Sequence, residues 1–393
     1  MKIVKPTNGQ ARHSRLSRLS RAGTAGDTQA VDGTPGSRDE GRDLTPVARD
    51  RVPVTPPNTV EGLVEEFSLS PRFPTREALE AEVDFWDATT AQWVGDCPRR
   101  AEYSIRLGLE RREEAPYLAA GKSLHAALAV YYAGAPDELA RAEMHRIWAL
   151  GPDFRLPPNH RFAHLHEGHL DVVLENYLEH ARRRDVFTPL RLKKEDLDLT
   201  DVLAAKWLLT PDGYIVFGEC KLVMRFEVNG EEFIYAGRPD LPAFMSGSVM
   251  LVDHKSTNSY LSEWWADQHR FSNQLRGYCA MFKKLVPKHE LTGAMINGLY
   301  IGAKATSKEF GGSRFARFGP YPYQPGHLAE AIRNQYTWRK MMTVYEQLGY
   351  YPQHASKLCG GCPFADLCEA SPASRASVIQ RQYVARSFNF LDF

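Results

Sequence analysis

The sequence lacks any run of about 20 apolar residues, the length that a helix needs to cross a membrane. Its amino-terminal residues supply basic and small side chains in place of the apolar core of a secretory signal. It also has no string G-x4-G-K-[S/T], the loop that cradles nucleotide phosphates. These absences predict a soluble, cytoplasmic protein with no membrane contact and no nucleotide-driven motor of its own.

An excess of charge of one sign is also missing. The 49 Lys and Arg residues nearly balance the 48 Asp and Glu residues, which leaves a net charge of +1. This balance gives no general attraction to polyanions, so any basic binding surface has to be local. The length of 393 residues is enough for one large domain or two ordinary domains.

Large apolar residues are scarce in the first 60 residues, which are rich in Arg, Ser, Thr, Gly and Pro. Such a segment cannot bury enough apolar surface to fold. Residues 1–60 are therefore predicted to be a disordered basic tail that ends in a proline-rich linker. From residue 61 the composition becomes globular, so we expect one folded domain over residues 61–393 that begins with a short helix over 61–67.

Strand-type runs are concentrated between residues 206 and 237. The runs KWLLT (206–210) and YIVFGECKLVMRFEV (214–228) flank a Pro-Asp-Gly turn, and EEFIYAG (231–237) follows after Asn229-Gly230. Asn-Gly between two such runs is a strong signal for a two-residue hairpin turn. Cys220 lies in the long run without a partner at metal-ligand spacing, so we expect it in the core.

The next stretch carries acids and an amine at strand spacing. In the apolar run 249–255, Asp253 and Lys255 share one face and His254 points to the other, because strand side chains alternate. The run 233–237 precedes it, and the Gly-, Pro- and Ser-containing connection between the two runs predicts that they form a hairpin.

Asp240 follows the first of these two runs, so a second acid is expected beside Asp253. Two acids and an ammonium group on adjacent strands suit hydrolysis assisted by a divalent cation such as Mg²⁺. Taken alone, the same residues also fit a surface ion pair, with Asp240 as a turn residue.

Two helices carry polar residues at a spacing of four, which places them on one helix face. The Ala-rich segment Tyr117–Tyr132 is apolar nearly all round, so it is expected to be buried with Gly121 and His125 inside it. A single helix is expected over 262–285, with Gln274 and Tyr278 on one face. Its core stripe is predicted to consist of Trp264, Phe271, Leu275, Tyr278 and Phe282.

Basic and aromatic residues alternate in KATSKEFGGSRFARF (304–318). Lysines and arginines among phenylalanines suit a groove that follows a nucleic-acid strand. A solvated hairpin fits this segment equally well. The residues concerned are Lys304, Lys308, Phe310, Arg314, Phe315, Arg317 and Phe318.

Three cysteines close the chain in the pattern C-x2-C-x5-C, at Cys359, Cys362 and Cys368. Without a secreted context this spacing favours one metal centre over disulfides. A fourth ligand has to come from elsewhere, and Cys97 fits because it precedes a helix against which the carboxy-terminal segment can pack. Four thiolates suit either zinc or a 4Fe–4S cluster, and the spacing does not decide between them.

The order and spacing of these motifs together resemble the RecB-like branch of the PD-(D/E)xK nucleases, which includes the CRISPR-associated adaptation nucleases and AddB-type nuclease domains. The resemblance implies an α/β fold in which a restriction-endonuclease-like mixed sheet is flanked by helices. It also implies an upstream helical region and a cysteine clasp that joins the two ends of the domain. The motifs are GKSLH (121–125), GRPD (237–240), VDHK (252–255), QLRGY (274–278) and the four cysteines.

The resemblance further implies a DNA exonuclease that hydrolyses phosphodiester bonds with Mg²⁺ or Mn²⁺. His125, Asp240 and Asp253 would hold the metal, with the main-chain carbonyl of His254 as a further ligand. Lys255 would position or activate the attacking water and stabilise charge in the transition state.

In the same family the pair Gln274 and Tyr278 helps to hold the active site and the DNA backbone. Glu219 approaches the metals there, but in this sequence we favour an ordinary exposed strand carboxylate.

The resemblance favours a structural 4Fe–4S cluster on Cys97, Cys359, Cys362 and Cys368, with zinc as the alternative. It implies DNA as the substrate and a protein partner such as a helicase or recombination factor. A catalytically inactive nuclease-fold module for DNA binding or assembly is the alternative function, against which the intact Asp240, Asp253 and Lys255 argue.

Overall fold

The structure is a computed structural model, and it describes residues 64–68, 88–152, 154 and 156–385. The chain divides into two units, Met1–Arg51 and Val52–Phe393. The predicted disordered tail and linker (1–60) lie outside the described residues, and all of the described elements belong to the second unit. Within the described ranges, no helix combines the length and the apolar character needed to cross a bilayer.

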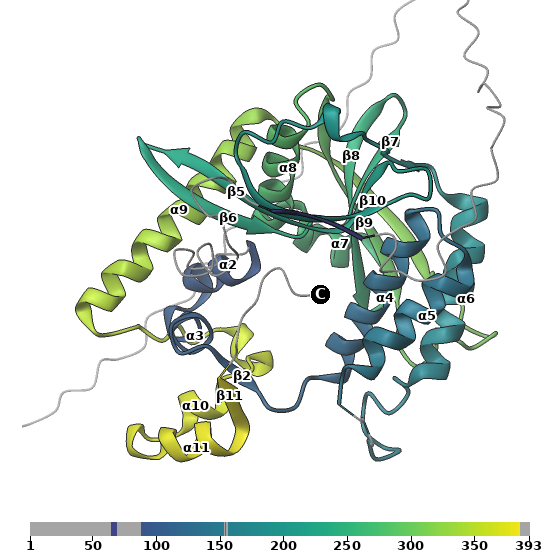
Figure 1. Cartoon of the computed structure of the whole chain (residues 1–393). Helices are drawn as coiled ribbons and strands as arrows, with labels where there is room; N and C mark the ends of the chain where they lie inside the picture. Colours follow the sequence, from purple (N-terminus) through teal and green to yellow (C-terminus); the bar gives the residue numbers. More distant parts are fainter. Residues whose placement is uncertain (1–63, 69–87, 153, 155, 386–393) are drawn as a thin grey trace, which may run out of the picture. The chain divides into compact units, whose positions relative to one another are not determined.

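The second unit is an α/β fold with two main sheets (Figure 1). One is a five-stranded mixed sheet in the order β10-β9-β8-β7-β3, in which only β8 and β9 run parallel. The other is an antiparallel sheet in the order β1-β4-β5-β6. The strands are β1 (Val64–Ser68), β2 (Leu109–Arg111), β3 (Thr188–Pro189), β4 (Val202–Leu209), β5 (Ile215–Val228), β6 (Glu231–Gly237), β7 (Leu241–Met245), β8 (Ser248–Thr257), β9 (Leu291–Tyr300), β10 (Phe315–Pro322) and β11 (Tyr383–Ala385).

Helices flank the mixed sheet, as predicted for a restriction-endonuclease-like fold. Helices α4, α5 and α6 pack together, and α8 packs against α9 (Figure 1). The helices are α2 (Ala88–Asp96), α3 (Pro98–Ala101), α4 (Pro116–Tyr132), α5 (Asp137–Ala149), α6 (Glu167–Arg184), α7 (Glu263–Arg270), α8 (Asn273–Leu285), α9 (Pro325–Leu348), α10 (Ala365–Glu369) and α11 (Arg375–Gln382).

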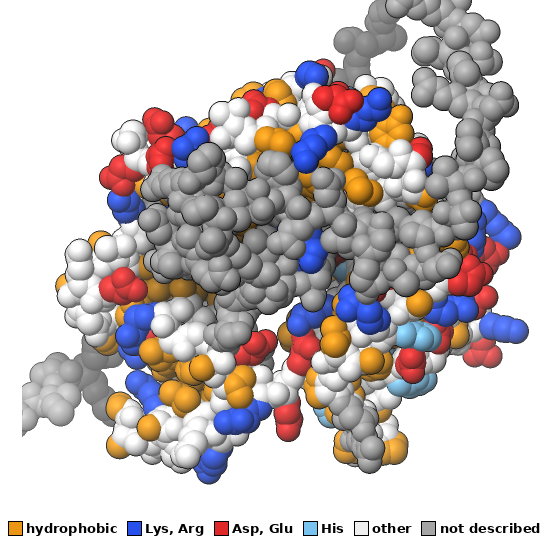
Figure 2. All heavy atoms as spheres, in the orientation of Figure 1, with side chains coloured by type: hydrophobic (Ala, Val, Ile, Leu, Met, Phe, Trp, Pro, Cys, Tyr) orange, Lys and Arg blue, Asp and Glu red, His pale blue; other side chains and the backbone are white. Residues whose placement is uncertain are grey.

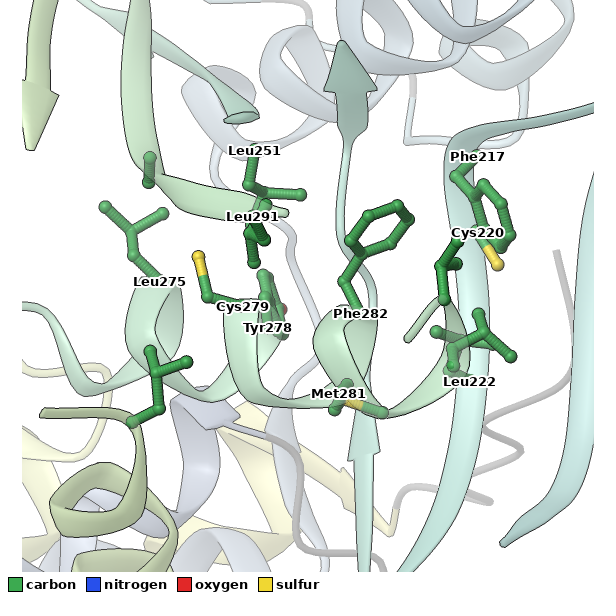
Figure 3. Close-up of a cluster of buried hydrophobic side chains, with 14 of the residues drawn as sticks. Phe217, Cys220, Leu222, Leu251, Leu275, Tyr278, Cys279, Met281, Phe282 and Leu291 are labelled. Atoms are coloured by element: carbon green, nitrogen blue, oxygen red, sulfur yellow. The ribbon is translucent and has the colours of Figure 1, made fainter. Parts of the chain in front are cut away.

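Strand β8 is buried on both faces, which explains its nearly continuous apolar run. On one face Leu251 joins a core in which α8 contributes Leu275, Cys279 and Phe282 (Figure 3). On the other face Val252 joins the core of helices α4 and α6. Each fully buried side chain of this size stabilises the fold by roughly 1.5–3 kcal/mol. The strand that carries Asp253 and Lys255 is therefore fixed between two packed layers.

The turns of the sheets follow from local sequence. Asn229 and Gly230 have φ values of 55° and 79°, so the predicted Asn-Gly hairpin joins β5 to β6. The predicted hairpin between 233–237 and 249–255 is wrong. The connection itself forms β7, which pairs with β8, whereas β6 belongs to the other sheet.

Two helix predictions need correction. Residues 64–67 of the expected helix 61–67 belong to strand β1 (Val64–Ser68), which pairs with β4. The single helix expected over 262–285 is two helices, because the Ser272 side chain accepts a hydrogen bond from Leu275 N (3.4 Å) and starts α8 anew. The expected core residues Trp264 and Phe271 are 86% and 68% exposed, whereas Leu275, Tyr278 and Phe282 are buried as predicted.

The two ends of the described domain are joined by a small module. Strand β2 pairs with β11, and the Arg111 guanidinium forms an ion pair with Asp366 (2.8 Å). Residues of both segments share a hydrophobic cluster that includes Tyr103, Phe364 and Leu367. The chain before α4 is thus tied to the carboxy-terminal segment by strand pairing, an ion pair and a hydrophobic cluster.

Candidate functional site

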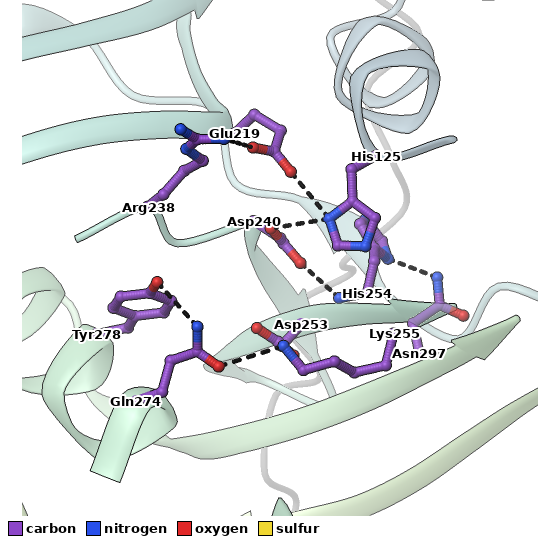
Figure 4. A network of polar contacts seen from close by, with 10 residues as sticks. All are labelled: His125, Glu219, Arg238, Asp240, Asp253, His254, Lys255, Gln274, Tyr278 and Asn297. Atoms are coloured by element: carbon purple, nitrogen blue, oxygen red, sulfur yellow. Dashed lines mark hydrogen bonds and ion pairs between the residues drawn. The ribbon is translucent and has the colours of Figure 1, made fainter. Parts of the chain in front are cut away.

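The two acids of the predicted site lie side by side. Leu241 pairs with Val252 in the β7–β8 ladder, which places the preceding Asp240 next to Asp253. The Asp240 Oδ2 atom accepts a hydrogen bond of 2.6 Å from the backbone N–H of His254 (Figure 4). Both acids are buried. The predicted convergence of two carboxyl groups from adjacent strands is therefore present in the structure.

Lys255 connects the catalytic strand to helix α8. Its Nζ atom lies 2.7 Å from Asp253 Oδ2 and donates to Gln274 Oε1 at 3.3 Å. The Gln274 amide nitrogen in turn donates to the Tyr278 hydroxyl at 3.2 Å. Burial lowers the pKa of Lys255, but the carboxylates of Asp253 and Asp240 outweigh burial and the pKa is raised. The amine is therefore held as an ammonium ion beside the two acids.

His125 reaches the same place from helix α4. Its Nδ1 atom lies 2.9 Å from Glu219 Oε1 and 3.5 Å from Asp240 Oδ1. One turn earlier, a Cβ atom on Gly121 would lie 3.0 Å from Ser256 Oγ of β8. The glycine thus lets α4 approach strand β8 closely.

Glu219 belongs to the site, and the expectation of an exposed strand carboxylate is wrong, because its side chain is only 14% exposed. Its φ of 51° is unusual for a non-glycine residue and carries a strain of about 1–3 kcal/mol. A Cβ atom on the preceding Gly218 would lie 2.9 Å from Ala129 Cα, so β5 touches α4 here. The Gly-Glu pair marks this position in the sequence but does not indicate which helix it meets.

The side chains of His125, Glu219 and Asp240 form a possible metal site, since one ligand atom of each lies within 4.8 Å of the others. Carboxylate oxygens with one imidazole suit a hard divalent cation. The structure therefore joins Glu219 to the predicted ligands His125 and Asp240. Asp253 lies beside Asp240 and is paired with Lys255 (Figure 4).

Charge coupling shifts all three pKa values of this group. Burial acts to lower the pKa of His125, but Asp240 and Glu219 raise it to about 10. Burial acts to raise the pKa of Glu219, but His125 and Arg238 lower it to about 2. Burial raises the pKa of Asp240 to about 6, with His125 opposing and Asp253 assisting this shift. The group thus holds two carboxyl groups and one imidazolium, which leaves a net negative charge when Asp240 ionises.

The His254 side chain points away from the acids into a buried polar network. Its Nδ1 atom lies 2.6 Å from the Asn297 amide nitrogen, and its ring stacks on Tyr132 with centroids 5.6 Å apart. Burial lowers the pKa of His254, which favours the neutral imidazole. Arg317 also enters this network, through Asn297 and through an ion pair of 2.5 Å with Asp185.

The predicted strand-tracking groove over 304–318 is only partly formed. Phe315 and Phe318 are buried and Arg317 is committed to the interior network, so these three residues cannot contact a strand. Lys304 and Lys308 remain exposed. On the face drawn in Figure 2, Lys and Arg side chains are intermixed with Asp and Glu, and histidines gather over α5 and α6.

The four predicted cysteine ligands line one cavity of about 390 Å³, together with Arg100. All four are free thiols. Burial raises the pKa of the Cys368 thiol, and the neighbouring Cys362 and Cys97 raise it further. Among the described residues, no three of these sulfur atoms lie within 4.8 Å of one another, in contrast to the ligand atoms of the His125 group. The remaining cysteines, Cys220 and Cys279, are buried in the core.

Comparisons with known proteins place the chain in a family. A search of curated proteins gave no match. Among solved structures, the chain is similar to one titled "Crystal structure of SSO0001", with 13% sequence identity, a TM-score of 0.31, and coverage of 76% of this chain and 92% of that one. This low similarity supports no conclusion about the fold or the function of the chain. A family model described as the PD-(D/E)XK nuclease superfamily matches residues 87–369, most of the chain, and the protein therefore belongs to the PD-(D/E)XK nuclease superfamily.

Proposed function

We propose that this metal-dependent nuclease is a DNA exonuclease that hydrolyses phosphodiester bonds with Mg²⁺ or Mn²⁺. The observation that carries the proposal is the convergence of His125, Glu219 and Asp240 on one point beside the Asp253–Lys255 pair. These side chains come from four separate segments of the chain. Their meeting at one place supports a common catalytic task more strongly than any single motif does.

The donor set fits a hard cation held by His125, Glu219, Asp240 and Asp253, with the main-chain carbonyl of His254 as an additional ligand. Such a cation supplies Lewis-acid stabilisation of the phosphoryl oxygens. The Lys255 ammonium, fixed by Asp253 and Gln274, positions the attacking water or a phosphate oxygen and stabilises the charge that develops there.

Gln274 and Tyr278 orient Lys255 from the side of α8, because Gln274 bonds both residues at once. With Lys255 held in this way, its ammonium does not need to reorganise when charge develops on the phosphate. We infer that this pair also lies along the path of the DNA backbone.

The test is cleavage of end-labelled linear DNA with Mg²⁺ or Mn²⁺ and with a chelator. We expect metal-dependent release of nucleotides from an end, and loss of activity in Asp253→Ala but not in Asp137→Ala, an acid on α5. Covalently closed circular DNA tests the mode, because an exonuclease leaves it intact. Equal activity of wild type and Asp253→Ala would end the catalytic assignment and favour the inactive DNA-binding module. Cutting of circles would overturn the exonuclease proposal.

We also propose that Cys97, Cys359, Cys362 and Cys368 hold a structural 4Fe–4S cluster. Zinc binds thiolates at about 2.3 Å, which places tetrahedral ligands about 3.8 Å apart. The four thiols border one cavity of about 390 Å³, and this room supports a cluster larger than a single ion.

Anaerobic purification tests the cysteine proposal. A brown protein with iron and sulfide is expected, and its cluster content should fall in Cys359→Ser but not in Cys220→Ala. A colourless protein with stoichiometric zinc would identify the alternative metal and overturn the cluster.

A further inference from the structure

The segment 258–273, which we call the aromatic connection, links the catalytic strand β8 to the catalytic helix α8. Both of its ends are fixed at the active centre, because Lys255 just before it bonds Gln274 just after it. The connection carries three exposed aromatic residues: Tyr260 is 59%, Trp264 86% and Phe271 68% exposed. Aromatic side chains of this size normally bury much of their surface. Three of them on one segment that begins and ends at the active centre indicate a ligand.

Trp264 lies in the first turn of α7, Phe271 directly follows its last residue, Arg270, and both side chains are exposed. Trp265 and Ala266 on the opposite side of α7 are buried. Trp265 therefore anchors the helix to the protein, and its neighbour Trp264 is presented outward. This arrangement gives a rigid ring face toward solvent at a fixed position beside the site.

Tyr260 is held in place by two further rings. Its ring is nearly parallel to those of Tyr300 and Phe310, with interplanar angles of 6–7° and centroids 4.8–5.8 Å apart within the group. A ring that is already fixed in this way loses little conformational freedom when another planar group stacks on it. The connection is therefore pre-organised for stacking at its first aromatic residue as well.

Charges on the connection, and Arg276 just beyond it on α8, restrict what the ligand can be. The guanidinium groups of Arg270 and Arg276 lie over the Phe271 ring, at 5.6 and 5.7 Å from its centroid. Glu263 and Asp267 lie beside Trp264 and are exposed. A flat and uniformly anionic surface, such as an acidic lipid bilayer, would be repelled at Trp264, whereas a flexible single strand can turn its phosphates toward Arg270 and Arg276 and a base toward Trp264. A ligand with uncharged planar bases and separate phosphates fits both the acidic surroundings of Trp264 and the arginines at Phe271.

We propose that the aromatic connection is a binding site for the unpaired bases of single-stranded DNA next to the scissile phosphate. Bases stack on Tyr260, Trp264 and Phe271, and Arg270 and Arg276 take up the neighbouring phosphates. Bases inside an intact duplex are already stacked on one another, so their faces cannot reach these rings. This inference rests on the proposed nuclease function and makes a single-stranded or frayed end the substrate of the site.

The experiment measures binding separately from cutting. Fluorescence anisotropy of a labelled oligothymidylate is recorded with the full chain in the presence of chelator, so that no hydrolysis occurs. Trp264→Ala should weaken binding about tenfold, the loss of one stacked base, and Trp264→Phe should restore part of it. Phe244→Ala is the matched control, because Phe244 is an exposed aromatic residue on β7, outside the connection. The affinity of this variant for the oligothymidylate should stay within about twofold of the wild-type affinity. Melting curves confirm that each variant is folded.

Several results would overturn the inference: no binding of oligothymidylate, equal affinity of wild type and Trp264→Ala, or blunt duplex bound as tightly as single strand. Self-association of the wild type that Trp264→Ala abolishes would assign the surface to a second copy of the chain and would also overturn it. Failure of the nuclease proposal is recognised differently. If Asp253→Ala cuts DNA as well as wild type does, the catalytic assignment falls, while the binding measurement still decides the role of the aromatic connection.

Discussion

The catalytic centre and the cysteine module are built in opposite ways. In the catalytic centre each functional side chain already has a protein partner: His125 contacts Glu219, and Lys255 contacts Asp253 and Gln274. These residues lie on a strand that is buried on both faces and on the helices packed against it. In the cysteine module the thiols border a cavity of about 390 Å³ and Cys359 is exposed.

The difference shows that the packed fold fixes the positions of the acids but not those of the thiols. The hydrophobic core fixes the acids before any cation arrives, so a cation only has to enter. The cysteine module has a much smaller hydrophobic cluster, around Tyr103 and Phe364, so its geometry depends on what the thiols bind. We therefore expect changes in the first region to affect chemistry and changes in the second to affect stability.

Replacement of Asp240 with Asn is expected to have the largest effect on activity, a loss of at least about a thousandfold, because one cation ligand is weakened where charge develops. The raised pKa of Asp240, about 6, means that its ionised form is disfavoured in the folded protein. This unfavourable contribution grows as pH rises from about 4 through 6. The melting temperature of metal-free Asp240→Asn at pH 7 should therefore not fall. A large fall would show that the carboxylate supports the fold.

Loss of the cysteine ligands should act on stability instead. A cross-link between Cys97 and Cys359 closes a long loop, and by analogy with a covalent cross-link it is worth about 4 kcal/mol, or on the order of 10 °C in melting temperature. Cys359→Ser should show this loss by calorimetry and retain nuclease activity at low temperature. Cys220→Ala serves as the control for cofactor content. If Cys359→Ser melts like wild type, the cysteines do not clasp the domain.

The Glu219→Gln variant tests whether Glu219 is a ligand of the metal site. The amide keeps the shape of the side chain but removes its charge, so affinity for Mn²⁺ should fall about 10- to 100-fold. Glu227→Gln on the same strand is the matched control, because Glu227 is exposed. Titration calorimetry of the two variants decides the point. Equal affinities would restore the interpretation of Glu219 as an ordinary strand carboxylate.

The smallest expected effect is a proton released when metal binds. The metal-free His125 has a pKa raised to about 10, so it is protonated at pH 7 and has to lose about one proton to become a ligand. Metal affinity should therefore increase as pH rises from 7 toward 10. Calorimetry in two buffers of different ionisation enthalpy measures the release, which His125→Gln should remove and His145→Gln should not. Retention of the full release in His125→Gln would exclude His125 as the ligand that loses it.

Local rules were sufficient to predict much of the site. Strand alternation placed Asp253 and Lys255 together with His254 on the other face, and a helical spacing of four joined Gln274 to Tyr278. The mixed α/β fold followed from the same patterns together with the family resemblance. These features depend on residues that are close in sequence or on the order of the motifs.

The errors arose where distant segments or breaks decide the structure. Glu219 reaches the site only because β5 approaches α4 at Gly218, which no local pattern encodes. Trp264 and Phe271 fit the periodicity of a continuous helix, but Ser272 restarts the helix and changes the face that is buried. Strand β7 was not predicted, because the Gly, Pro and Ser residues of its segment are typical of a turn.

The pairing of β2 with β11 has a consequence for how the protein is made. His125, Glu219, Asp240, Lys255 and Gln274 have all been added to the growing chain once residue 274 is made. The partner strand of β2, residues 383–385, is synthesised only afterwards. Before β11 is made, the apolar side chains of Tyr103 and Leu109 lack the neighbours that bury them in the folded protein. Closure of this module therefore comes after the other segments are made, and we expect chains halted near residue 350 to expose the apolar surface around Tyr103 and Leu109.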